Sequence, residues 1–245
     1  MKTVIIIPAR YSSTRLNAKP LIEVGGKPII QWVYEQAKTV SAADDVIVAT
    51  DNQEIFDTCK NFGGKVEMTS VDHKSGTDRI AEVISRHDEY DLIVNLQGDE
   101  PLISTQNITT AINLLKNDSN ADISTLVKVV KEKEEIENPN LVKCIFDINN
   151  YAIYFSRNKL PYERKDYEGD FYGHIGLYCY TREALLKMTK LPQANIEKAE
   201  SLEQLRAVYN GMKIKVAVVE SNAIGIDTKE DLEAFENYVK MHKII

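Results

Sequence analysis

The stretch that decides the fold is Asp91 to Pro101, which reads DLIVNLQGDEP. It begins with the apolar run Leu92-Ile93-Val94, which is typical of a strand buried on both faces of a parallel sheet. Polar residues follow at once and end in Asp99 and Glu100, before Pro101 stops the strand. Because open α/β sheets bind ligands at the carboxyl edge of their strands, we expect Asp99 to face a cleft. A carboxylate there suits Mg²⁺ bound to phosphates; the alternative is a polar turn that caps the next helix.

Strands and helices alternate through the first half of the chain. Apolar runs predict strands at 3–7, 46–49, 65–68 and 92–94. Amphipathic segments between and after them predict helices at 29–41, 54–62 and 104–117. This alternation predicts an α/β fold with a doubly wound, mostly parallel sheet.

The pattern changes after residue 121. Short apolar runs at 123–130, 142–146 and 151–155 are separated by turns, and Asn149-Asn150 is a hairpin signal. We interpret the charge run 131–138 as a solvated linker and 196–209 as one helix. These features predict a smaller mixed or antiparallel lobe. The chain is therefore expected to be a single domain with a first half (1–120), this lobe (121–220) and a closing segment (221–245).

Composition excludes several classes of protein. The net charge of −7 over 245 residues argues against a general nucleic-acid binder. The three cysteines are widely spaced and form no CxxC, which favours a reducing compartment and no metal cluster. No apolar run reaches the roughly 18 residues of a membrane span, and Pro8-Ala9-Arg10 interrupts the first run before it could form a signal peptide. We predict a cytoplasmic protein.

A polar and basic loop, ARYSSTRLNAKP, follows the first strand from Ala9 to Pro20. Its cations and hydroxyl groups belong to Arg10, Arg15 and Lys19 and to Ser12, Ser13 and Thr14. Arginine forks and a lysine point charge suit the oxygens of a polyphosphate. The loop is neither GxGxxG nor a Walker loop. A solvated basic loop is the alternative, but the position after the first strand favours binding.

Three further places carry candidate ligands. In HKSGTDR (73–79), Ser75 or Thr77 can cap a helix whose free amides suit an anion or a nucleobase edge, whereas capping does not explain Arg79. Arg157 ends a predicted strand and could bind a carboxylate. Asp227, at the start of the last helix, is the second carboxylate that we place beside Asp99.

Seven ordered blocks carry a family resemblance across essentially the whole chain: IIIPARYSSTRLNAKPL, HKSGTDR, VNLQGDEP, FSRNKLPY, HIGLYCY, LEQLR and GIDTKEDL. In order and spacing they resemble the 3-deoxy-manno-octulosonate (Kdo) cytidylyltransferases, or CMP-Kdo synthetases. The resemblance implies a nucleotidyltransferase fold and a homodimer. It also implies that CTP and a 2-keto sugar acid are joined into a CMP-sugar for lipopolysaccharide, with release of pyrophosphate.

The resemblance also implies roles for individual residues. The CTP phosphates would be held by Arg10, Ser13, Arg15 and Lys19, and the cytidine by Ser75, Thr77, Arg79 and Gln97. The sugar pocket would be lined by Arg157, His174, Tyr178, Glu203 and Gln204. Mg²⁺ would bind Asp99 and Asp227, which with Lys19 and Arg15 form the catalytic set. The family's usual Pro-Gly before the loop lysine is Asn17-Ala18 here.

Three alternatives stay open at this point. The sugar could be another acid sugar, such as 8-amino-Kdo or a nonulosonic acid. The nucleotide could differ, although relatives that transfer other nucleotides usually open on a Gly-rich loop. The protein could also be a nucleotide-sugar sensor without turnover, although a pure binder needs no metal pair. Because no Ser/His/Asp or Cys/His arrangement is evident, we expect direct in-line transfer without a covalent intermediate.

Overall fold

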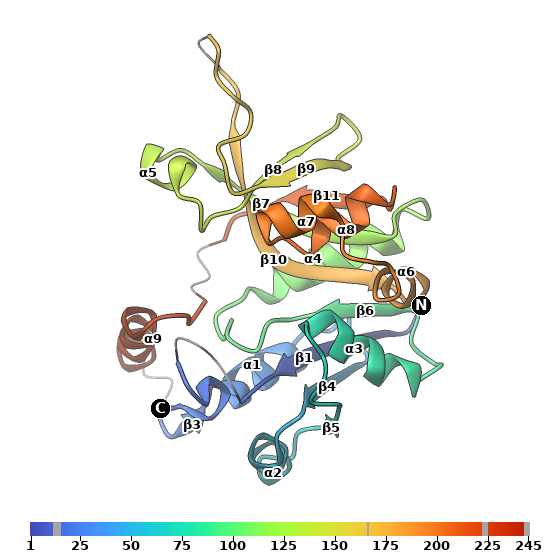
Figure 1. Ribbon diagram of the computed structural model, residues 1–245. Coiled ribbons are helices and arrows are strands. Elements are labelled where there is room, and N and C mark those ends of the chain that lie inside the picture. Colours follow the sequence, from blue (N-terminus) through green and yellow to red (C-terminus); the bar gives the residue numbers. More distant parts are fainter. Residues whose placement is uncertain (12–15, 166, 222–224, 243–245) are drawn as a thin grey trace. The chain divides into compact units, whose positions relative to one another are not determined.

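The computed structural model describes residues 1–11, 16–165, 167–221 and 225–242 (Figure 1). The chain divides into two compact units: Met1–Thr109 with Asn222–Ile245, and Thr110–Ser221. The first unit thus combines most of the predicted first half with the closing segment. None of the helices in the described ranges is long and apolar enough to cross a membrane.

The first unit is built on four parallel strands, in the order β6–β1–β4–β5. Their bounds are β1 (Thr3–Ala9), β4 (Asp45–Thr50), β5 (Val66–Met68) and β6 (Leu92–Asn95). The central strand β1 is apolar on both faces, and Val4 to Ile7 are fully buried. Ile5 lies opposite Val46 on one side and Val94 on the other. The predicted parallel sheet is confirmed.

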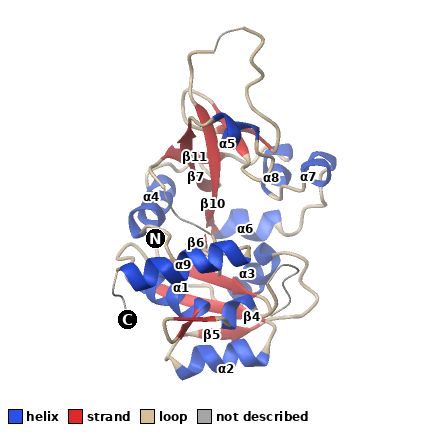
Figure 2. Ribbon diagram, turned by 90° about the vertical axis from the view of Figure 1, so that its left-hand side faces the viewer, coloured by secondary structure: helices blue, strands red, loops and turns tan. Residues whose placement is uncertain are grey.

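Helices α1 (Ile29–Lys38), α2 (Gln53–Asn61) and α3 (Gly76–Ser85) pack against these strands (Figure 2). The unit also contains α9 (Lys229–Met241) and the first part of α4 (Thr105–Lys116). A short 3₁₀ helix, η1 (Lys19–Leu21), and the hairpin of β2 (Glu23–Val24) and β3 (Lys27–Pro28) precede α1. Side-chain caps set the helix starts, as predicted: Ser75 Oγ accepts from Asp78 N, and Thr228 and Asp231 form a capping box.

The second unit is a mixed sheet, as predicted. Its strands are β7 (Ile123–Val130), β8 (Lys143–Phe146), β9 (Ala152–Ser156), β10 (Phe171–Thr181) and β11 (Ile214–Val218). Strand β10 is antiparallel to β7 and β8, β8 and β9 form the hairpin, and β11 runs parallel to β7. Its short helices are α5 (Lys133–Glu137), α6 (Arg182–Met188), α7 (Asn195–Glu200) and α8 (Gln204–Tyr209).

Two predictions for the second unit were wrong. The charge run contains α5, because Ile136 is buried against Val130 and Phe171 and anchors one turn of helix. The single helix predicted over 196–209 is two helices, α7 and α8. Ser201 between them has a left-handed backbone with φ of 51°, which an α-helix cannot accommodate.

Candidate functional site

The first cluster joins three charged side chains of the first unit. Lys19 Nζ lies 2.5 Å from Asp99 Oδ2 and 3.1 Å from Asp227 Oδ1, and it donates to the Ile226 carbonyl at 2.8 Å. Only 13% of the Lys19 side chain is exposed, against 28% and 45% for the two aspartates. One ammonium group therefore sits between two carboxylates that are 128 residues apart in sequence (227 − 99).

Backbone contacts hold this cluster together. Lys19 opens η1, and Ala18 before it has the left-handed φ of 52°. Asp99 follows β6, and its carbonyl accepts from Ile226 N at 2.8 Å, which ties the turn before α9 to the loop after β6. Asp227 N donates to Asp231 Oδ2 of the α9 capping box at 3.0 Å. The capping box thus orients the same turn that presents Asp227.

Glu100 is a further carboxyl group beside this cluster. Burial raises its pKa to about 7, and the charges of Asp99 and Asp227 raise it in the same direction. Its Oε2 atom is buried without a hydrogen-bond partner. The negative charges of the cluster therefore act on Glu100, which Lys19 does not contact in the described structure.

The donor atoms of the cluster fit Mg²⁺. Asp99, Asp227 and the Ile226 carbonyl offer oxygen atoms, which hard divalent cations prefer. Within the described ranges, no group of three or more His, Cys, Asp or Glu side chains is arranged to hold a metal. Magnesium commonly binds through one or two carboxylates and completes its shell with water and substrate phosphates. The pair Asp99–Asp227 matches that mode of binding.

Two glycines let the surrounding segments approach the end of β1 closely. A Cβ atom on Gly98 would lie 3.1 Å from the Pro8 carbonyl, and one on Gly76 would lie 3.2 Å from Pro8 Cγ. The loop after β6 and the start of α3 therefore converge on Pro8. Gly98 serves the close backbone approach that the sequence predicts.

The residues predicted for the nucleotide lie around this convergence. Arg10 is exposed directly after β1, Ser75 is half-buried as the cap of α3, and Thr77 is buried in its first turn. Gln97 follows β6 and donates to Asn95 Oδ1 at 3.3 Å. Ser13 and Arg15 lie outside the described residues.

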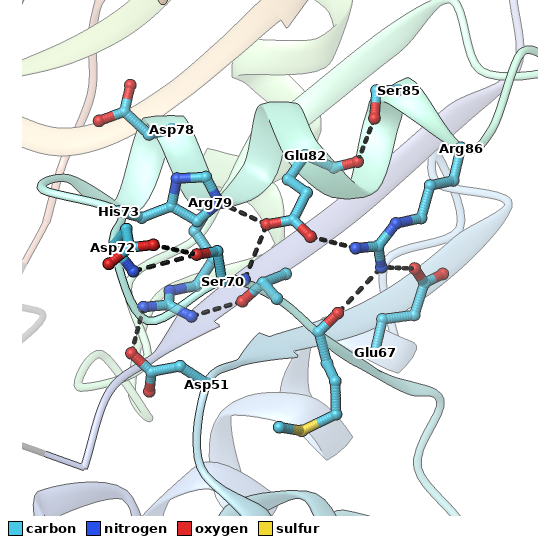
Figure 3. A network of polar contacts seen from close by, with 12 residues as sticks. Asp51, Glu67, Ser70, Asp72, His73, Asp78, Arg79, Glu82, Ser85 and Arg86 are labelled. Atoms are coloured by element: carbon cyan, nitrogen blue, oxygen red, sulfur yellow. Dashed lines mark hydrogen bonds and ion pairs between the residues drawn. The ribbon is translucent and has the colours of Figure 1, made fainter.

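Arg79, also predicted at the cytidine, is fully buried (Figure 3). Its Nη2 pairs with Asp51 Oδ2 at 2.6 Å, and its Nη1 donates to the Thr69 hydroxyl. The pairing with Asp51 explains why a cation is stable near the start of α3, which helix capping did not explain. The two partners lie just after β4 and β5, so the guanidinium joins α3 to the ends of two strands.

A second network in Figure 3 fixes the segment before α3. Glu82 on α3 accepts from Ser70 N at 2.8 Å and contacts His73 Nε2 at 2.5 Å and the guanidinium of Arg86. Arg86 also donates to the Met68 carbonyl at 2.9 Å. These contacts hold residues 68–73, which lead directly to Ser75.

The second unit holds the five residues predicted for the sugar acid. Arg157 follows β9, and its Nε and Nη1 donate to the carbonyls of Glu200 (2.7 Å) and Pro139 (3.1 Å). Its backbone N–H donates to Glu200 Oε2 at 2.9 Å. Backbone carbonyls therefore hold the guanidinium in place and use part of its five N–H donors.

His174 and Tyr178 form an aromatic group on β10. Their ring centroids are 5.3 Å apart, and Phe155 lies edge-on to His174 at 5.1 Å. Burial lowers the pKa of His174 to about 3, so the imidazole is neutral. Burial raises the pKa of Tyr178 well above its usual value, and the charge of Glu203 adds to this shift.

Glu203 and Gln204 lie at the junction of Ser201 and α8. Glu203 is half-buried as the residue before the helix, and Gln204 is buried as its first residue. Four positions that shape these sites were not predicted from the sequence. They are Asp51, Glu100, the carbonyl of Ile226 and Thr125, whose hydroxyl oxygen lies 2.9 Å from His174 Nε2. Glu100 alone had a signal, since it stands in the deciding stretch.

The family model described as "Cytidylyltransferase" matches residues 4–214. The chain belongs to the cytidylyltransferase family. A protein of Fusobacterium nucleatum named 3-deoxy-manno-octulosonate cytidylyltransferase is 48% identical over 100% of this chain and 99% of its own length. One of the same name from Parabacteroides distasonis is 50% identical over 95% of this chain and 96% of its own.

A solved cytidylyltransferase structure has the same fold. CMP:2-keto-3-deoxy-manno-octonic acid synthetase, complexed with CTP, aligns with a TM-score of 0.94 and 39% identity, over 99% of this chain and 100% of that one. A cytidylyltransferase from Leptospira borgpetersenii aligns with a TM-score of 0.66 and 22% identity, over 98% of this chain and 87% of that one, and shows the fold alone.

Proposed function

We propose that the protein transfers CMP from CTP to the anomeric hydroxyl of 3-deoxy-D-manno-octulosonate, forming CMP-Kdo and releasing pyrophosphate. The observation that carries the proposal is the Lys19 ammonium held between the carboxylates of Asp99 and Asp227. Full-length relatives named for this activity and a solved relative with CTP support the nucleotide and the sugar acid.

The reaction asks mainly for positioning and charge neutralisation. The anomeric oxygen of the sugar acid attacks the α-phosphorus, and the bond between that phosphorus and the bridging oxygen breaks as pyrophosphate leaves. The lone pair for the new bond comes from the sugar oxygen, whose proton is lost to solvent. Lys19 neutralises charge on the phosphate oxygens. Arg10 adds a second cation next to the end of β1.

The carboxylates of Asp99 and Asp227 would hold Mg²⁺. When bound, the ion supplies neutralisation of the triphosphate and a lower pKa for the attacking hydroxyl. Lys19 keeps the two carboxylates together in the structure described here, at 2.5 and 3.1 Å. In the reaction we assign its ammonium to the phosphates, so the lysine exchanges partners when nucleotide and metal bind.

We assign the binding of the sugar acid to residues of the second unit. Three of the five N–H donors of the Arg157 guanidinium contact the carbonyls of Glu200, Pro139 and Ser201, and the others suit a carboxylate. The neutral ring of His174, the Tyr178 hydroxyl and the polar ends of Glu203 and Gln204 suit the hydroxyl groups of a sugar. We place the enzyme in lipopolysaccharide synthesis in the cytoplasm, as a homodimer without nucleic-acid or membrane partners.

Two experiments test the proposal: identification of the product, and the turnover of a variant that lacks one carboxylate. With CTP, Kdo and Mg²⁺, mass spectrometry of the product should show CMP-Kdo. Asp227→Asn should lose most turnover, because the metal pair loses one charge. Asp57→Asn is the matched control, since this exposed carboxylate of α2 contacts Gln53 on its own helix. Equal turnover of the two variants would contradict the metal role.

A further inference from the structure

Strand β10 contains an irregularity beside the predicted sugar residues. His174 lies opposite Val127 and Tyr178 opposite Thr125, so four residues of β10 cover two positions of β7. In a regular strand, residues four apart are separated by about 13 Å. The bulge at Gly176 and Leu177 shortens this step and brings the two rings to 5.3 Å.

The Thr125 hydroxyl lies at the centre of the bulge. Its oxygen is 2.8 Å from the Leu177 carbonyl, 3.3 Å from the Ile175 carbonyl and 2.9 Å from His174 Nε2. Thr125 is fully buried, so water does not replace these partners. The bulge displaces the two carbonyls from the regular ladder, and the threonine hydroxyl lies within hydrogen-bond distance of both.

One proton must serve these three neighbours. A carbonyl oxygen only accepts, so the hydroxyl proton points to Leu177, the shorter of the two carbonyl contacts. If the hydroxyl donated to His174 instead, its lone pairs would face two buried carbonyl oxygens, which is unfavourable. The hydroxyl oxygen must therefore accept from His174, and Nε2 of the imidazole carries the hydrogen.

We propose that Thr125 is a positioning residue that fixes His174 as the Nε2–H tautomer and thereby makes Nδ1 an acceptor for a hydroxyl group of the sugar acid. The tautomer assignment stands on the geometry alone, whereas the ligand rests on the proposed function. Nδ1 has no hydrogen-bond partner among the described residues, consistent with a site left for a substrate. Because burial lowers the pKa of His174 to about 3, the ring stays neutral and the tautomer persists at neutral pH.

This tautomer would make His174 favour a hydroxyl group of the sugar acid over its carboxylate. A lone pair on Nδ1 accepts from a sugar hydroxyl and repels a carboxylate, which has only acceptors when ionised. His174 would thus accept a hydrogen bond from a hydroxyl group, and Arg157 would bind the carboxylate. The bulge contributes to this arrangement, because it brings the imidazole of His174 and the ring of Tyr178 close together on β10.

The tautomer is measured directly by long-range ¹H–¹⁵N correlation spectra of protein labelled at its four histidines. The His174 signals are assigned by their loss in His174→Phe. At neutral pH we expect the Nε2–H pattern in the unaltered protein and in Thr125→Ser, which keeps the hydroxyl. An Nδ1–H pattern in the unaltered protein would overturn the proposal, whether or not any variant folds.

Kinetics test the consequence for the ligand. Thr125→Val should raise KM for Kdo about tenfold and leave KM for CTP unchanged, whereas Thr125→Ser should behave like the unaltered enzyme. Ser124→Ala is the matched control, since this buried hydroxyl one residue earlier donates to the Ala111 carbonyl and should leave both KM values unchanged. Equal KM for Kdo in Thr125→Val and Ser124→Ala would overturn the positioning role.

Failure of the proposed function is distinguishable from failure of this inference. If no acid is a substrate, the kinetic experiment has no baseline, yet the spectra still decide the tautomer. If His174→Phe leaves KM for Kdo unchanged, His174 does not contact the sugar acid, and the ligand half of the proposal is overturned. The Nε2–H pattern together with a raised KM for Kdo in Thr125→Val supports both halves.

Discussion

The buried ion pair between Arg79 and Asp51 gives the sharpest prediction for stability. At 2.6 Å and an effective dielectric constant of about 20, the attraction of the two charges is about 6 kcal/mol before desolvation is subtracted. Removing one partner of a buried pair costs about 3–5 kcal/mol, because the other charge stays buried. The two single substitutions should differ within that range.

The difference follows from the exposure of the two side chains. Asp51→Ala leaves Arg79 charged with 0% exposure, so we expect a loss near 5 kcal/mol in the free energy of unfolding. Arg79→Met leaves Asp51, which is 17% exposed and therefore in contact with water, so we expect a loss near 3 kcal/mol. The double variant should lose less than the sum, since the charges act as a pair.

Trp32 provides the assay. It is the single tryptophan of the chain and lies on α1 of the same unit, with its ring edge-on to Phe235 at 5.8 Å. Urea unfolding followed by its fluorescence therefore reports on the unit that holds the pair. Glu236→Ala is the control, because its contact with Lys240 is 4.0 Å long and exposed, and should change stability by under about 0.5 kcal/mol.

Two results would contradict the structural role of this ion pair. If Asp51→Ala and Arg79→Met each cost less than about 1 kcal/mol in the free energy of unfolding, the pair does not hold α3 to the strand ends. If Arg79→Met instead keeps full stability and raises KM for CTP alone, the guanidinium acts on the nucleotide, as the resemblance implied.

Three more predictions concern the Lys19 cluster and the second unit. Lys19→Met should lower kcat about 100- to 1,000-fold, measured by pyrophosphate release; a loss under about tenfold contradicts its assignment to the phosphates. The pKa of His174 is lowered from 6.5 to about 3, so the unfolded chain binds the extra proton between these values. Stability should therefore fall as pH falls through this window, and less steeply in His174→Phe; parallel curves from urea titrations refute this. Glu197→Gln should destabilise the protein by about 3 kcal/mol, since buried Arg206 loses its charged partner; a loss under about 1 kcal/mol refutes it.

The strands could be predicted because their signal is local. A run such as Val4 to Ile7 has no polar face, so it is stable only between two layers, and that fact is readable without any partner. The caps of α3 and α9 were readable for the same reason, since a cap and its helix are adjacent in sequence. The break at Ser201 was not, because the residue is an ordinary serine in an amphipathic pattern.

The contacts between distant residues could not be read from the chain. Asp51 and Arg79 form an ion pair although they lie 28 residues apart in sequence. The residues around either one give no sign of its partner. Thr125 stands in a strand of apolar and small residues, and its role arises only because β10 bulges opposite it. Lys19, Asp99 and Asp227 were grouped beforehand, since the sequence placed Asp227 beside Asp99 and the resemblance added Lys19. The direct contact of one ammonium with both carboxylates was not predicted, because it depends on how the fold closes.

The proposed activity is tested most directly by pyrophosphate release with Mg²⁺ and each of CTP, UTP, GTP and ATP against Kdo, 8-amino-Kdo and a nonulosonic acid. We expect release with CTP and Kdo, and background release with the other nucleotides. Release with CTP and a different acid alone would move the sugar assignment and keep the mechanism. No release from any pair, together with tight binding of CTP, would contradict the proposed CMP transfer and would favour a nucleotide sensor.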